Sequence, residues 1–265
     1  MKIHKHISQG TLLHTCLDED NSCSDEKNYY QDKVTVVENE YFRWIAFDDV
    51  IQSVMNRRKP WLLTLPHQNA MMFPLLFFKP NKVVELGLGG GNFQRFIYHL
   101  APEATMHSIE HNNLVIDCFN QYFNPAKLKT HVVYQDSNLW LLSKDCHEYD
   151  WFICDIYQQH LASYDSTVKQ FSSFTAHLNN QTCLTINMPE ASDSEIGLCL
   201  MLLKELFTEH HILYFHIPNY LNIVIHLIPK QWNTPKLLKR NKQSYLPDYL
   251  FSKWRGFWQA GKSYK

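Results

Sequence analysis

From residue 82 onward, short apolar runs alternate with segments whose apolar residues recur every three or four positions. Runs of the first kind predict buried strands, and segments of the second kind predict amphipathic helices. Strands are expected at 83–86, 104–110, 131–135, 149–155 and 181–188. Helices are expected at 92–100, 112–123, 165–178 and 193–208, with a short one from Ser137. Such alternation predicts a parallel sheet with right-handed crossovers.

Two apolar runs break this alternation near its end. The runs 211–217 and 221–228 are separated only by Pro218-Asn219-Tyr220, a spacing that predicts a hairpin and therefore one antiparallel strand. The expected fold class is α/β, with a seven-stranded sheet whose last strand is antiparallel. This arrangement is typical of the class I methyltransferase-like (Rossmann-like) fold, whereas a dinucleotide-binding sheet is more often wholly parallel.

The residues before 82 follow a different pattern. Residues 1–30 are polar, so we expect a flexible N-terminal segment. Short apolar runs at 34–38, 42–47 and 50–55 are separated by acidic turn residues, and they predict a small β-sheet domain over 31–64. We then expect a Rossmann-like nucleotide-binding domain over 65–229.

The last segment, 230–265, is basic and aromatic. It contains nine Lys and Arg residues, one acid (Asp248), and the tryptophans Trp232, Trp254 and Trp258. Such a tail can bind single-stranded nucleic acid. We favour a helical tail that covers the domain or forms a dimer contact, and we expect no nucleic acid partner.

Composition limits the classes of function. The 265-residue chain has a formal net charge of −1, which provides no overall field for nucleic acid or a membrane surface. No apolar run reaches the roughly 18 residues that cross a bilayer. The seven cysteines show no CxxC spacing, so we expect reduced thiols and a cytoplasmic protein. The histidines occur mostly singly, so we expect no metal site.

A glycine-rich turn follows the first strand of the alternating region. The sequence KVVELGLGGG places Gly87, Gly89, Gly90 and Gly91 between an apolar run and an amphipathic segment. Glycine has no Cβ, so the backbone can adopt positive φ and a ligand can approach it closely. The following helix offers free N–H groups and a positive dipole end. A tight structural turn would leave the same pattern, so the turn alone does not establish a ligand site.

Acids stand at the ends of the next three expected strands, where ligands bind in doubly wound sheets. Glu110 ends the second strand and can accept both hydroxyls of a ribose. Asp136, followed by Ser137, comes after the third strand and can accept from the amine of adenine. Asp155 ends the fourth strand, with Tyr157 two residues later, and faces the expected place of a transferred group. Three such acids predict an adenosine-type ligand.

The acids alone do not choose between NAD and S-adenosylmethionine. The turn spelling E-x-G-x-G-G-G, which begins at Glu85, and the closing hairpin favour S-adenosylmethionine. A helix N-cap or turn residue is the alternative role for Asp155.

Three segments resemble the spermidine synthase (polyamine aminopropyltransferase) family and its bacterial spermidine synthase-like relatives. They are RWIAFDDVIQSVM, PLLFFKPNKVVELGLGGGNFQRF and YDWFICDIY, and the similarity runs over about 34–228. The resemblance implies that Glu110 binds ribose, Asp136 binds adenine, and Gln52 lies near the amino-acid end of the cosubstrate. It also implies that Asp155 deprotonates an attacking amine, and that the chain forms a homodimer.

The chain departs from the family at the amine end. Asn92 stands where the family has an Asp for the ammonium of the cosubstrate, Pro66-His67-Gln68 replaces a Tyr-His/Gln-Glu triplet, and Gln158 replaces the second acid of a loop. Each change removes negative charge, and neutral amides bind cations more weakly than carboxylates do. We therefore expect intact S-adenosylmethionine to be tolerated better than its decarboxylated form, and we do not expect putrescine as the acceptor.

Several functions remain open. The first is a transferase that moves a methyl or aminopropyl group from S-adenosylmethionine or its decarboxylated form to a small acceptor, such as an amine. The second is a genuine aminopropyltransferase that uses other acids, for example Asp165 or acids of a neighbouring subunit. The third is a non-catalytic nucleoside-binding module, and an NAD-dependent oxidoreductase is the weakest.

Overall fold

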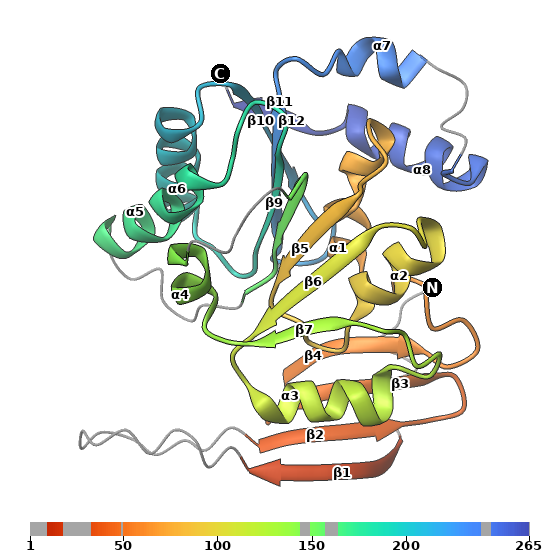
Figure 1. Ribbon diagram of the computed structural model, residues 1–265. Helices are drawn as coiled ribbons and strands as arrows, with labels where there is room; N and C mark the ends of the chain where they lie inside the picture. Colours follow the sequence, from red (N-terminus) through yellow and green to blue (C-terminus); the bar gives the residue numbers. More distant parts are fainter. Residues whose placement is uncertain are drawn as a thin grey trace.

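The computed structural model describes residues 10–17, 33–48, 50–143, 149–156, 164–239 and 245–264, except for the side chains of 17, 164–166 and 170. Figure 1 shows a large sheet covered by helices on both faces, with a smaller sheet below it. The segment around Tyr157, including Gln158, and the whole of the polar run 18–28 lie outside the described residues.

The smaller sheet is antiparallel and is formed by the N-terminal strands. Its order is β1-β2-β3-β4, and the strands are β1 (Thr11–Leu17), β2 (Lys33–Glu38), β3 (Phe42–Phe47) and β4 (Val50–Asn56). Strand β1 pairs with β2 along its length, from Thr11 opposite Glu38 to Leu17 opposite Lys33. The expectation of a flexible segment is therefore wrong for 11–17. Pairing with β2 orders this segment, and its polar sequence neighbours gave no sign of that pairing.

The large sheet has the order β12-β10-β11-β9-β8-β5-β6-β7 in the described part of the chain. Its strands are β5 (Lys82–Leu86), β6 (Thr105–Glu110), β7 (His131–Tyr134), β8 (Trp151–Cys154), β9 (Cys183–Met188), β10 (His210–His216), β11 (Ile223–Pro229) and β12 (Lys262–Tyr264). Strands β5 to β9 are parallel, and β11 runs antiparallel between β9 and β10. The expected methyltransferase-like sheet with an antiparallel last strand is confirmed, and β12 adds an eighth strand that the sequence pattern did not predict.

Helices cover both faces of this sheet (Figure 1). On one face lie α4 (Ser137–Leu142), α5 (Tyr164–Ser173) and α6 (Asp193–Leu206), packed over Val84, Phe152 and Ile225. The other face carries α1 (Pro66–Met71), the 3-10 turn η2 (Phe73–Leu76), α2 (Asn92–Leu100) and α8 (Asp248–Gln259). The sheet is therefore the middle layer of three, and its central strands β5, β8, β9 and β11 are buried on both sides, whereas the edge strands β7 and β12 are largely exposed.

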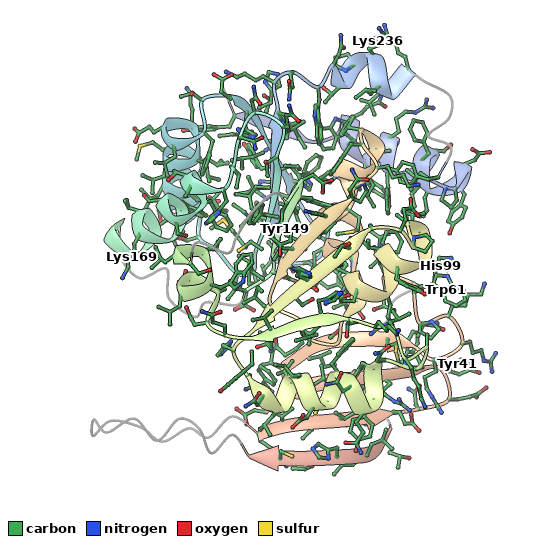
Figure 2. The ribbon with its side chains drawn as sticks, viewed as in Figure 1. Tyr41, Trp61, His99, Tyr149, Lys169 and Lys236 are labelled. Carbon is green, nitrogen blue, oxygen red and sulfur yellow. The ribbon has the colours of Figure 1, made fainter. Side chains whose placement is uncertain are left out.

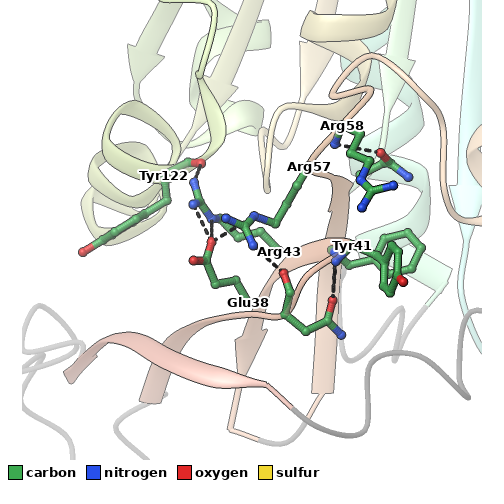
Figure 3. Close-up of polar contacts among 9 residues, drawn as sticks. Glu38, Tyr41, Arg43, Arg57, Arg58 and Tyr122 are labelled. Carbon is green, nitrogen blue, oxygen red and sulfur yellow. Dashed lines mark hydrogen bonds and ion pairs between the residues drawn. The ribbon is translucent and has the colours of Figure 1, made fainter.

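The N-terminal sheet is tied to the large domain by an arginine cluster (Figure 3). Arg43 donates to Glu38 through Nε (2.9 Å) and Nη2 (2.5 Å), and its Nη1 donates to the carbonyl of Tyr122 (2.5 Å). Tyr122 belongs to the π-helical turn η3 (Phe119–Phe123), which continues α3 (Asn113–Cys118). Below this contact, Phe119 and Phe123 pack with Val34 and Ile45 in a shared apolar cluster. These contacts fix β4 beside the large sheet.

The segment that joins β4 to α1 is also anchored. Trp61 stacks on His99 of α2, with ring centroids 4.5 Å apart, and Figure 2 shows the two rings side by side. Thr64 Oγ1 donates to the Val54 carbonyl at 2.6 Å. The end of β4 and the start of α1 therefore lie on the same side of the glycine turn.

The C-terminal tail forms α7 (Thr234–Lys239), α8 and β12. Trp254 and Trp258 are buried in the core against η2, and the hydroxyl of Tyr245 donates to the carbonyls of Leu75 and Phe78. The aromatic residues of the tail thus contribute to packing. Within the described residues, no helix combines the length and apolar character that spanning a membrane requires.

Candidate functional site

A cavity of about 280 Å³ opens between β4, α1 and the carboxyl ends of β5, β8 and β9. Seven residues proposed from the sequence line it: Gln52, Glu85, Gly87, Gly89, Gly90, Asn92 and Asp155. Other side chains in its wall were not proposed as site residues, namely Ser53, His67, Gln68, Asn187, Glu190 and Asn222. Among the described residues, no group of three or more His, Cys, Asp or Glu side chains is arranged to hold a metal ion.

The glycine turn forms the floor of the cavity. Gly87 has φ +92°, and a Cβ at this position would lie 2.6 Å from the carbonyl oxygen of Asp155. A Cβ at Gly90 would lie 2.6 Å from Ser53 Oγ. Only glycine therefore lets the turn pass between β8 and β4, and the turn presents backbone rather than side chains to a ligand.

Asn92, the first residue of α2, lines the cavity but is already engaged by the protein. Its Nδ2 donates to the Val54 carbonyl at 3.3 Å, and its Oδ1 accepts from Arg95 Nη2. Arg95 is itself buried and donates to the carbonyls of Pro60 (2.8 Å), Gly90 and Phe123 (2.7 Å). The side chain of Asn92 therefore links the two domains and shapes the turn.

A buried cation and a buried carboxyl group lie behind the turn. Burial lowers the pKa of Arg95 to about 9, although the nearby Glu85 opposes this shift. Because this pKa is still above neutral pH, the guanidinium remains charged. Burial also raises the pKa of Glu85 well above its usual value, against the hydrogen bond from Ser108 Oγ (2.6 Å). Arg95 therefore places a positive charge behind the turn, beside a carboxyl group whose ionisation burial opposes.

Asp155 stands directly after β8 and begins a chain of polar contacts. Its Oδ1 accepts from Asn187 Nδ2 at 2.8 Å, and Asn187 Oδ1 accepts from Asn222 Nδ2 at 3.0 Å. The two asparagines orient the carboxylate in the cavity. Ile156, the next described residue, is not helical. Tyr157, its proposed assistant, lies outside the described residues.

Glu110, at the end of β6, lies beyond the cavity wall and beside the glycine turn. Its Oε2 accepts from the Leu88 N–H at 2.9 Å, and its Oε1 accepts from the Asn112 N–H at 3.0 Å. Burial alone would raise the pKa of Glu110, but hydrogen bonds from His111, Leu88 and Asn112 outweigh it and hold the pKa below its usual value. Glu110 is therefore a fixed, ionised carboxylate.

The next strand end carries Asp136 and Ser137. Asp136 is the N-cap of α4, and its Oδ1 accepts from the N–H groups of Asn138 and Leu139, both at 2.9 Å. Ser137 is the buried first residue of that helix. Neither these two residues nor Gly91 lines the cavity. The described site thus has two parts, a cavity around Asp155 and a row of acids at the ends of β6 and β7.

Some cavity residues were predictable and others were not. Asn187 lies near the end of β9, so the rule that selected Glu110 and Asp155 would also have selected it. Glu190 has φ +55°, and its N–H donates to the Leu221 carbonyl at 3.3 Å. Asn222 precedes β11, a strand that runs the opposite way. Only the fold brings the start of that strand to this edge.

Comparison with curated proteins found short matches to polyamine aminopropyltransferases. A probable polyamine aminopropyl transferase of Bifidobacterium longum is 26% identical over 55% of this chain and 32% of its own length. A polyamine aminopropyltransferase of Neisseria meningitidis is 39% identical over 26% of this chain and 27% of its own. The chain thus matches about a third or less of these relatives' length, and no family model matches it.

Solved structures share the fold. A probable spermidine synthase from Corynebacterium glutamicum has a TM-score of 0.62 at 16% identity, over 78% of this chain and 80% of its own. A spermidine synthase in complex with the transition-state analogue AdoDATO has a TM-score of 0.58 at 15% identity, over 91% of this chain and 82% of its own. Human methyltransferase-like protein 13 in complex with SAH has a TM-score of 0.54 at 14% identity, over 74% of this chain and 92% of its own. The chain is thus similar in sequence, over part of its length, to polyamine aminopropyltransferases, and it shares its fold with spermidine synthases and a methyltransferase.

Proposed function

We propose that the chain is a transferase that moves a methyl group from S-adenosylmethionine, or an aminopropyl group from its decarboxylated form, to a small acceptor. The observation that carries the proposal is the cavity in which the glycine turn, Gln52 and Asp155 converge. Proteins of the same fold bind AdoDATO or SAH, and both of these ligands contain adenosine.

The residues around the turn suit an adenosyl ligand. The backbone at Gly89 is open, since a Cβ there would meet nothing closer than Ser53 Cβ at 3.9 Å. Glu110 is ionised, and a carboxylate has about four acceptor sites, so about one remains for a ribose hydroxyl after the bonds from Leu88, Asn112 and His111. The hydrogen bonds at Asp136 use only Oδ1, which leaves Oδ2 for the adenine amine.

The charges behind the turn favour a donor that keeps its carboxylate. Arg95 is charged, and burial opposes ionisation of the Glu85 carboxyl group. A carboxylate here is attracted by the guanidinium of Arg95. Gln52 of β4 lines the cavity, and its amide can hydrogen-bond the amino-acid end of the donor.

The chemistry is displacement at a carbon that the donor's sulfonium activates. The protein supplies orientation and excludes water, which together account for much of such a rate enhancement. Asp155 accepts a proton from the attacking group, while Asn187 holds its carboxylate in place. Tyr157 is the second proposed catalytic residue.

Ranking the donors by thermal shift tests this proposal. We expect S-adenosylmethionine and methylthioadenosine to raise the melting temperature and NAD to leave it unchanged, because binding to the folded state stabilises it. The decarboxylated donor should stabilise less than S-adenosylmethionine at equal concentration. If no adenosyl compound stabilises the protein, the proposal is wrong.

A genuine aminopropyltransferase is the second candidate, and Glu190 favours it. This carboxyl group lines the cavity and can attract a polyamine nitrogen. A larger thermal shift with the decarboxylated donor than with S-adenosylmethionine would support this candidate and contradict the charge argument above. Tight nucleoside binding without turnover of any amine would instead indicate a non-catalytic binding module.

A further inference from the structure

His67 is a polar side chain in the cavity wall that no described residue engages. It lies on α1, and its Nδ1 is buried without a hydrogen-bond partner among the described residues. Because Nδ1 is buried, a ligand in the cavity can use the ring only through Nε2, which is not among the buried unpartnered atoms.

The His67 ring is neutral at neutral pH. Burial lowers the pKa of His67, against the opposing effect of the Asp155 carboxylate. A neutral imidazole has one donor and one acceptor nitrogen, so with the proton on Nδ1 the other nitrogen, Nε2, is an acceptor.

The other groups around His67 provide little negative charge. Gln68 is used by the fold, since its Oε1 accepts from the Leu65 N–H at 3.2 Å. Asn187 and Asn222 are amides, burial opposes ionisation of Glu85, and Arg95 places a positive charge behind the turn. Among the described lining residues the other carboxyl groups are Asp155 and Glu190, and Glu190 is exposed, so water weakens its attraction for a cation.

We propose that the acceptor is an amine whose second polar group is an uncharged hydrogen-bond donor, as in an amino alcohol. The proposal rests on the proposed function, because it names the acceptor class for the same cavity. The amine lies against Asp155, and the hydroxyl donates to Nε2 of His67. A diamine would place its second ammonium against a neutral imidazole, with no carboxylate to replace the lost water.

Calorimetric titration of matched amines tests the acceptor class. The probes are aminopropanol and diaminopropane, then aminobutanol and putrescine, each added to the full chain saturated with methylthioadenosine. We expect the amino alcohol of each pair to bind about ten- to a hundredfold more tightly, which corresponds to one satisfied instead of one unsatisfied buried group.

Substitution of His67 tests the residue itself. His67→Glu adds a carboxylate and should reverse the preference toward the diamine, while His67→Phe should remove the preference and leave both probes weak. His216→Glu makes the same change at an exposed histidine outside the cavity and should leave the preference unchanged. If the His67 variants fail to fold, the wild-type comparison still decides.

The possible outcomes separate this inference from the proposed function. If methylthioadenosine does not bind, both are wrong. If methylthioadenosine binds but the diamines bind as tightly as the amino alcohols, or more tightly, the inference alone is overturned. A preference for amino alcohols that persists unchanged in His67→Phe would overturn the role of His67.

Discussion

Asp155→Asn is expected to lower kcat by about 10²–10⁴-fold, the usual contribution of a positioned proton acceptor. Asparagine keeps an oxygen that can accept from Asn187 Nδ2, so the fold and the shape of the cavity should be preserved. The loss should therefore appear in turnover and not in binding. The measurement is transfer from labelled S-adenosylmethionine to a panel of small amines and amino alcohols, alongside titration of S-adenosylhomocysteine.

Asp193→Asn is the matched control for this experiment. Asp193 is an exposed acid in the first turn of α6 and lies outside the cavity, so its variant should retain turnover. If Asp155→Asn turns over substrate within about threefold of the wild-type rate, Asp155 is not the proton acceptor, because such a role is worth far more than that.

Gly87→Ala is expected to destabilise the protein by about 2–5 kcal/mol. The φ of +92° disfavours any side chain, and the new Cβ would lie 2.6 Å from the Asp155 carbonyl oxygen, so backbone must shift. In a protein of this size, each kcal/mol lowers Tm by roughly 2–4 °C. Denaturant unfolding measures the loss, and turnover should fall too because Asp155 moves.

Gly89→Ala separates the two causes of that loss. Gly89 also has positive φ, at +50°, but its nearest neighbour for a Cβ is 3.9 Å away. The Gly89→Ala variant should lose only the part of the free energy of unfolding that comes from the positive φ, about 1–2 kcal/mol. Equal losses for the two variants would show that contact between the turn and Asp155 does not constrain the fold.

The large sheet was predictable because its central strands are buried on both faces and read as continuous apolar runs. The hairpin spacing at 218–220 was enough to indicate the antiparallel β11. Strand β1 was missed because its order comes from pairing with β2, and β12 because three residues carry no periodic signal. Both strands form by pairing with segments distant in the sequence, and the local hydrophobic pattern contains no information about such pairing.

Some residues of the site were likewise predictable from the sequence, and others were not. Glu110 and Asp155 were predictable, since each ends a strand whose direction the pattern already fixed. Asn92 was expected to face the donor, but the structure shows its amide held by Val54 and Arg95. The resemblance already matched Pro66-His67-Gln68 to a triplet of the family, but only tertiary structure reveals that His67 and Asn222 share a cavity with Asp155.

The central claim is that this edge of the sheet binds an adenosyl nucleoside. The most direct test is calorimetric titration of S-adenosylhomocysteine into wild-type protein and into the Glu110→Gln variant. We expect one site per chain in the wild type and binding weakened about tenfold or more in Glu110→Gln, since a charged hydrogen bond to ribose is worth roughly 1.5–3 kcal/mol. Glu205→Gln, an exposed change on α6, should have no effect. No binding by the wild type, or equal binding by wild type and Glu110→Gln, would contradict the claim.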